Sequence, residues 1–155
     1  MPLVRLVYFS LARPPEGHSL DHLMPGILWQ GRRRNLDDGV TAVLVSVGPY
    51  FVQMLEGQRD VLTALFDRIY RDPRHSNVEM VDFSSIRTRE LGDWSLAYHL
   101  VDPEDEVTAR RFARGGTIDP AQFGADMARH FILAMARQGE RAAAQRAGFA
   151  TPVTA

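Results

Sequence analysis

The order in which two kinds of apolar pattern follow one another constrains the fold of this chain more than any other feature. Short apolar runs rich in β-forming residues predict strands over residues 3–9, 40–47, 50–55, 78–83 and 94–100. Apolar residues at helical spacing predict one helix between the first two strands and another between the third and fourth. This order indicates a ferredoxin-like α+β sandwich, βαββαββ, with two helices on one face of a mixed sheet.

Residues that start or stop helices mark the ends of both predicted helices. Ser19 and Asp21 are candidates for the N-cap of the first helix, and Pro25 favours Asp21 because proline is tolerated near the first turn. Asn35 is suited to a left-handed cap at the other end of this helix. Pro73 is expected to stop the second helix.

The composition changes to Ala, Arg and Glu beyond Asp102-Pro103, which predicts a two-helix appendage at the C-terminus. A short helix is expected near 104–114, followed by a break at Gly115-Gly116. A longer helix is expected to open at Asp119-Pro120.

One stripe of the longer helix is too apolar to face water alone, so we expect it to dock on the sheet or on a second subunit. Its members are Phe123, Met127, Phe131 and Met135. The predicted organisation is a main domain over residues 1–101, a helical cap or oligomerisation segment over 102–147, and a flexible tail over 148–155.

Composition excludes several kinds of chemistry. The chain has no cysteine, which removes disulfides, thiolate nucleophiles and Cys-ligated zinc. All 18 basic residues are arginine, so no lysine can form a Schiff base or serve a phosphate-binding P-loop. The net charge of −1 points to neither nucleic acid nor a membrane surface, and no apolar run approaches the roughly 20 residues of a membrane helix. With no signal-peptide pattern at the start, we expect a cytoplasmic protein.

Two polar side chains are predicted to project from apolar strand faces. Gln53 has the parity of Phe51 and Leu55, and Tyr8 lies on the apolar face of the first strand. Taken singly, each is more often a core residue whose polar group is satisfied by backbone or water. Adjacent central strands would nevertheless place the two side by side under the helices.

Other polar residues have equally ordinary explanations when taken one by one. Arg68 and Asp72 are four residues apart, so they are expected to share a helix face, where most such pairs are solvated salt bridges. The run Arg32-Arg33-Arg34 is able to hold phosphate or to compensate the helix dipole. The five histidines lack the spacing of metal ligands, so no metal site is predicted.

Several sequence blocks occur in order over roughly the first 100 residues. They are Arg5-Leu6-Val7-Tyr8-Phe9-Ser10, Arg33-Arg34-Asn35, Gly39-Val40-Thr41, Phe51-Val52-Gln53-Met54-Leu55-Glu56-Gly57, Arg68-Ile69-Tyr70-Arg71-Asp72-Pro73-Arg74-His75 and Trp94-Ser95. Together they resemble the BLUF family, sensors of blue light using flavin. The Q-x-L-E-G and R-D-P-R-H blocks are specific as a set.

The resemblance implies a blue-light photoreceptor without catalytic activity, with a flavin bound non-covalently between the two helices. That flavin would be FAD, with FMN and riboflavin as alternatives. Asn35 would contact the flavin carbonyl edge, and Arg68 and Asp72 its pyrimidine side. The full implied set of cofactor-binding residues is Ile27, Arg34, Asn35, Gln53, Arg68, Ile69, Asp72, Arg74 and His75.

The resemblance also implies a photoactive switch made of Tyr8, Gln53, Trp94 and Leu96. Blue light would move an electron and a proton from Tyr8 to the flavin, and Gln53 would rotate or change tautomer, which shifts the absorption to the red. The chain departs from the family pattern at Leu96, where relatives have methionine, and at Arg34, where many have asparagine.

The implied partners are the flavin, other copies of the chain in a dimer or larger oligomer, and an unidentified downstream protein. Two other functions share the predicted topology. One is a non-photoactive ferredoxin-like ligand-binding or assembly module, which predicts colourless protein. The other is a small hydrolase of the acylphosphatase type, for which the loop after the first strand offers only Arg13.

Overall fold

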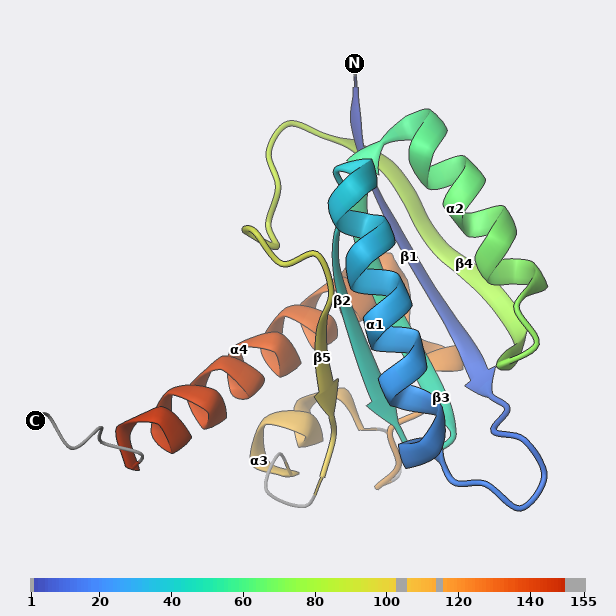
Figure 1. The fold of residues 1–155 in the computed structure, drawn as a ribbon. Helices are drawn as coiled ribbons and strands as arrows, with labels where there is room; N and C mark the ends of the chain where they lie inside the picture. The colour runs from blue at the N-terminus through green and yellow to red at the C-terminus, as the bar shows by residue number, and fades with distance from the viewer. Residues whose placement is uncertain (1, 103–105, 114–115, 150–155) are drawn as a thin grey trace, which may run out of the picture.

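The computed structural model describes residues 2–102, 106–113 and 116–149. Its strands are β1 (Leu3–Ala12), β2 (Thr41–Val47), β3 (Tyr50–Gln58), β4 (His75–Ile86) and β5 (Ala97–Leu100). Its α-helices are α1 (Leu20–Asp38), α2 (Arg59–Arg71), α3 (Glu106–Ala109) and α4 (Ala125–Phe149). Figure 1 shows α1 and α2 on one face of the sheet and α4 crossing the opposite face.

The five strands form one mixed sheet in the order β4-β1-β3-β2-β5. β1 is antiparallel to both β3 and β4, and β2 is antiparallel to β3, whereas β5 pairs with β2 in parallel. The prediction of a ferredoxin-like α+β sandwich is therefore confirmed. The central strands β1, β3 and β2 carry nearly all of the fully buried strand residues.

The two faces of the sheet bury separate apolar clusters. Along β1, Leu6 and Tyr8 belong to the cluster under α1 and α2, whereas Val7 and Phe9 belong to the cluster under α4. This alternation is what a strand with both faces covered requires. The sheet therefore has one face for a site between helices and another for the C-terminal helix.

The apolar stripe of α4 docks on the sheet of its own chain. Phe131 and Met135 are completely buried, Met127 packs against the same cluster, and Phe123, two residues before α4 begins, is 8% exposed in that cluster. Of the two occupants predicted for this stripe, the sheet is therefore the one observed. The contact buries large side chains at a gain of about 1.5–3 kcal/mol each.

The N-terminal end of α1 differs from the prediction. The helix begins directly after Ser19, which has the extended backbone of an N-cap, and Asp21 lies inside the first turn. The preference for Asp21 was wrong because Pro25 is accommodated farther inside the helix. The Pro25 side chain is exposed there, so water can reach the backbone group that loses its partner.

At the other end of α1, Gly39 and not Asn35 is the cap. Gly39 has φ 68°, a left-handed backbone that glycine adopts without a Cβ clash, and Val40 donates its N–H to the Asn35 carbonyl at 2.8 Å. Asn35 remains within the helix with 4% of its surface exposed. Its side chain is therefore directed inward, where a polar group needs partners.

Element ends also differ elsewhere. The edge strand β4 is longer than the predicted 78–83, and β5 begins three residues later than predicted. α4 begins at Ala125, because Asp119 accepts a hydrogen bond from the Ala121 N–H at 3.0 Å and caps a separate 3₁₀ turn. Residues 103–105, 114–115 and 150–155 of the predicted appendage and tail lie outside the described residues.

A buried carboxylate anchors the connection between β4 and β5. Glu56, on the α4 side of β3, is completely buried and accepts hydrogen bonds from the backbone N–H groups of Glu90 at 2.6 Å and Leu91 at 3.0 Å. The Thr41 hydroxyl donates a third at 3.0 Å. Arg89 adds bonds to the Thr41 hydroxyl and to the Glu56 and Gly39 carbonyls. The connection is thus held firmly to the centre of the sheet.

Replacing Glu56 with glutamine should lower the free energy of unfolding by about 2 kcal/mol, because an amide NH₂ would then face backbone N–H donors. Urea unfolding of both proteins measures the difference. Glu16→Gln, in an exposed loop, is the matched control and should change stability by less than about 0.5 kcal/mol. Equal stability of Glu56→Gln and the control would contradict this role.

Candidate functional site

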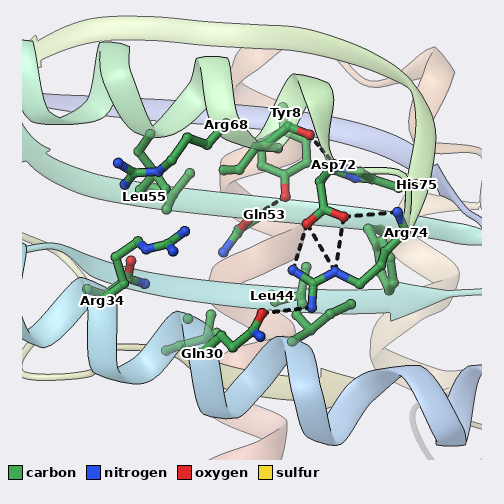
Figure 2. A pocket seen from close by; sticks show the side chains of 17 residues that line it. Tyr8, Gln30, Arg34, Leu44, Gln53, Leu55, Arg68, Asp72, Arg74 and His75 are labelled. Atoms are coloured by element: carbon green, nitrogen blue, oxygen red, sulfur yellow. Dashed lines mark hydrogen bonds and ion pairs between the residues drawn. The ribbon is translucent and has the colours of Figure 1, made fainter.

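A pocket lies between α1 and α2, with the sheet as its floor, as Figure 2 shows. Every residue predicted to bind a cofactor lines it: Ile27, Arg34, Asn35, Gln53, Arg68, Ile69, Asp72, Arg74 and His75. The floor also includes Tyr8 and Leu96 from the predicted switch. The lining residues come from α1 and α2, from strands β1, β2, β3 and β4, and from the segment before β5. They are far apart in the sequence, so only the fold brings them together.

Tyr8 and Gln53 form the central polar pair of the floor. β1 and β3 pair in a register that places the two residues directly opposite each other. The Tyr8 hydroxyl donates to Gln53 Oε1 at 2.5 Å, and the residues are 3% and 7% exposed. Figure 2 shows the other end of the Gln53 amide directed toward the open part of the pocket.

Burial raises the pKa of the Tyr8 hydroxyl, and the nearby Asp72 charge raises it further. The phenol therefore stays protonated at any physiological pH and acts as a hydrogen-bond donor. An amide partner can either accept from it or, if turned over, donate to it. The pair consequently has two hydrogen-bonded arrangements of nearly equal volume.

One end of the pocket is crossed by an ion pair. Arg74 contacts Asp72 through its side chain at 2.6–3.0 Å and through its backbone N–H at 2.9 Å. Burial alone would raise the pKa of Asp72, but the hydrogen bonds from Arg74 outweigh it and hold that pKa below its usual value. Arg74 also donates to Gln30 Oε1 at 3.2 Å, which links the end of α2 to α1.

The expected pair of Arg68 and Asp72 is not formed. α2 ends at Arg71 and Asp72 has an extended backbone (φ −72°, ψ 121°), so Asp72 no longer shares the helix face of Arg68. Arg68 instead lies 3.7 Å from Asp38, and both side chains are more than one third exposed. Such an exposed pair contributes little to stability.

His75 is held in one neutral tautomer. Its Nε2 lies 2.6 Å from the Ile69 carbonyl oxygen, which can only accept, so Nε2 carries the proton. Nδ1 therefore accepts from the Ser10 hydroxyl, 2.8 Å away. Burial lowers the pKa of His75. The Ser10 partner was not predicted, although its parity with Tyr8 places it on the same face.

The segment before β5 is tied to α1 at the pocket edge. Asn35 Nδ2 donates to the Ser95 carbonyl at 2.7 Å, and Arg32 Nε donates to the Leu96 carbonyl at 2.9 Å. Gly31 faces Leu96 so closely that a Cβ there would lie 2.7 Å from Leu96 Cδ2. Neither Gly31 nor Gln30, which also lines the pocket, carried a sequence signal of its own.

Trp94 is the one predicted switch residue that does not line the pocket. It is partly buried against the cluster under α4, on the opposite face of the sheet from Gln53. Leu96, two residues later, belongs to the cluster under α1 and α2 and lines the pocket. A regular strand would place residues two apart on one face, and the irregular backbone before β5 turns these two to opposite sides. The part of Trp94 in a switch stays a prediction.

Comparison with known proteins identifies the family of this site. The family described as sensors of blue light using FAD, BLUF, matches residues 3–97. This chain belongs to the BLUF family. The recognition made from the sequence blocks is confirmed, and the family is one of sensors, which agrees with a sensory rather than an enzymatic domain.

The relatives include proteins of very different length. The β subunit of a photoactivated adenylate cyclase of Euglena gracilis is 36% identical over 95 residues, which are 61% of this chain but 11% of that protein. The blue light- and temperature-regulated antirepressor BluF of Escherichia coli is 34% identical over 73% of this chain and 28% of its own length. The chain thus spans only about a tenth to a quarter of the length of these relatives.

Solved structures share the fold of this chain. The photo-activated state of BlsA superposes with a TM-score of 0.77 at 26% identity, covering 86% of this chain and 94% of BlsA. BlrB in its dark state has a TM-score of 0.62 at 32% identity, covering 72% of this chain and 79% of BlrB. The likeness to BlsA extends well beyond the residues that the family match covers.

The described part of the chain contains neither a cluster of metal ligands nor a membrane-spanning helix. No three His, Asp or Glu side chains lie together there as a metal ion would require. Among the same residues, no helix is both long enough and apolar enough to cross a membrane.

His75 should make the folded protein less stable as the pH falls. Its folded-state pKa lies below 6.5, so the unfolded chain binds the proton more tightly and the free energy of unfolding falls as pH drops through that value. Urea unfolding at about pH 7.5 and about pH 5.5 measures this loss, which His75→Gln should reduce. His18→Gln, in an exposed loop, should retain it. An identical loss in His75→Gln would contradict the assignment.

Proposed function

We propose that this domain is a blue-light photoreceptor that holds a flavin non-covalently between α1 and α2 and switches through Tyr8 and Gln53. The observation that carries the proposal is the buried hydrogen bond of 2.5 Å between these two side chains in the floor of the pocket. A structural glutamine would be satisfied by its neighbours alone, whereas this amide also borders the pocket. Membership of the BLUF family supports the same reading.

The residues of the pocket fit a planar heteroaromatic ring. Ile27 from α1 and Ile69 from α2 supply apolar side chains on the two helical walls, and Leu44 and Leu55 supply an apolar floor. Polar groups are few and lie at defined places, which is the usual composition of a cofactor site. Flat apolar faces and a polar rim are the surfaces that an isoalloxazine ring offers.

Each polar residue then has a proposed contact. Asn35 has two amide N–H donors, so it can hold the Ser95 carbonyl with one and a flavin carbonyl with the other. Arg68 and Asp72 would lie at the pyrimidine side, and Arg74 and His75 toward the ribityl phosphate. We infer FAD as the bound form because the family is described by that cofactor.

The chain's own part in the photochemistry is the supply and return of a proton and an electron. A bound flavin absorbs blue light and becomes a strong electron acceptor. The Tyr8 phenol is protonated and hydrogen-bonded, so it can give up an electron and a proton together. Gln53 can then exchange its donor and acceptor ends without a change of volume. The result is a changed hydrogen-bond pattern rather than a product.

The sensor would cover residues 1–101, with residues 102–147 as the segment that meets other proteins. BlrP1 of Klebsiella pneumoniae, determined with cyclic diGMP, has a region similar to this chain that is 28% of its length, so this fold occurs within larger proteins. For this chain we infer a cytoplasmic homo-oligomer with a downstream protein partner. The apolar stripe of α4 is buried on its own sheet, so assembly would use other surfaces.

Gln53→Leu should still bind flavin but lose the light-induced red shift, because leucine keeps the bulk and removes the hydrogen bonds. Absorption spectra of the flavin-loaded variant before and after blue light measure both properties. A normal red shift in this variant would contradict the proposal.

Gln30→Leu is the matched control, because Gln30 lines the same pocket on α1 and bonds Arg74 instead of Tyr8. At saturating flavin it should keep the full shift. Loss of the shift in both variants would show that the pocket tolerates no leucine, and Gln53 would then have no special part in the switch.

A further inference from the structure

Two arginines approach the same end of the pocket from opposite walls. Arg34 extends from α1 and Arg68 from α2, at the end away from the Arg74–Asp72 pair, with Gln53 between the two ends, as Figure 2 shows. Both belong to the lining of the pocket. Arg34 therefore adds a second cation to the end of the pocket that Arg68 also lines.

The cations of the pocket are not equally neutralised. Arg74 is paired with Asp72, the one carboxylate among the lining residues, at 2.6 Å. Arg68 has Asp38 at 3.7 Å, a long contact between side chains that are 45% and 38% exposed. Among the described residues, Arg34 has no carboxylate or carbonyl partner. The Arg34 end of the pocket therefore carries an excess of positive charge.

Arg34 and Arg68 carry like charges at the same end of the pocket, and water screens part of their repulsion because Arg34 is exposed and the Arg68 side chain is 45% exposed. Leu55 and Leu65 from the sheet and α2 line this pocket, and such walls weaken the screening by water. A negatively charged or strongly polarised group placed between the guanidiniums would relieve the repulsion. Arginine also offers several N–H donors in one plane, which suits a planar acceptor edge.

We propose that Arg34 and Arg68 form a paired-cation clamp for the pyrimidine end of the flavin ring and favour the ring in its negatively charged reduced state. This inference rests on the proposed function, because it concerns the same pocket. Reduction of a flavin by two electrons with uptake of one proton leaves one negative charge, which is spread over the pyrimidine end. The clamp stabilises that charge more than it stabilises the neutral oxidised ring.

A second group on a flavin nucleotide, the phosphate, offers the same anionic chemistry. The two sources differ in one respect, because riboflavin has the ring and lacks the phosphate. A clamp on the ring contributes equally to the binding of riboflavin, FMN and FAD. A phosphate site contributes to FMN and FAD alone.

The test compares the unaltered protein with Arg34→Gln, with Arg34→Lys to restore the charge, and with Arg33→Gln as the matched control. Arg33 is the neighbouring exposed arginine of α1, stacked on Trp29 and not part of the pocket lining. Fluorescence titration gives the dissociation constants of riboflavin and FAD. Dithionite titration with a reference dye gives the midpoint potential of the bound flavin.

Arg34→Gln should weaken riboflavin and FAD binding by the same factor, about fivefold, and should lower the midpoint potential. Arg34→Lys should recover most of the potential, and Arg33→Gln should change neither quantity. Weakened FAD binding with unchanged riboflavin binding would overturn the proposal in favour of a phosphate site. An unchanged potential in Arg34→Gln would also overturn it.

The outcomes for this clamp and for the proposed function are distinct. If the unaltered protein binds no flavin, both fail. If it binds flavin and shows the red shift while Arg34→Gln behaves as the unaltered protein does, only the clamp fails.

Discussion

The register between β1 and β3 is the constraint on which the rest of the site depends. It places Tyr8 opposite Gln53, and a slip of one residue in either strand would turn the side chain of that strand toward α4 and separate the pair. The register is determined by the two apolar clusters, since Leu6 and Leu55 must face α1 and α2 while Val7 and Met54 face α4. Burial of apolar side chains on both faces thus positions a polar pair that neither cluster would favour by itself.

The two faces of the sheet meet at the connection between β4 and β5. On the α4 side, Leu91 is completely buried and Trp94 packs beside it, while Glu56 holds the backbone that precedes them. On the pocket side, Asn35 holds the Ser95 carbonyl and Leu96 packs against α1. One short segment is therefore in contact with both the pocket and the C-terminal helix, and each contact is made by a different residue.

The sequence predicted the parts of this structure that depend on periodicity. Strand parity identified the faces of Tyr8 and Gln53, and helical spacing identified the stripe of α4 that docks on the sheet. Parity could not show which tertiary partner a polar side chain finds.

The features that parity and spacing did not place depend on those tertiary contacts. Asn35 has the type of a helix cap, yet a glycine four residues later takes that position and the asparagine turns inward. Arg68 has the spacing of a salt bridge, yet α2 ends one residue before the expected partner. Trp94 and Leu96 belong to one sequence block, and the irregular backbone before β5 turns them to opposite sides of the sheet, which period-2 parity does not predict.

The most direct measurement of the central claim is the absorption spectrum of the flavin-loaded, unaltered protein in darkness, after blue light, and again in darkness. Because Tyr8 and Gln53 border the pocket, rearrangement of their hydrogen bond should shift the flavin band to the red without bleaching, and the band should return in the dark. A bound flavin whose spectrum stays the same under blue light would contradict the account, since the pair would then be a structural hydrogen bond and the domain a flavin-binding module without a switch.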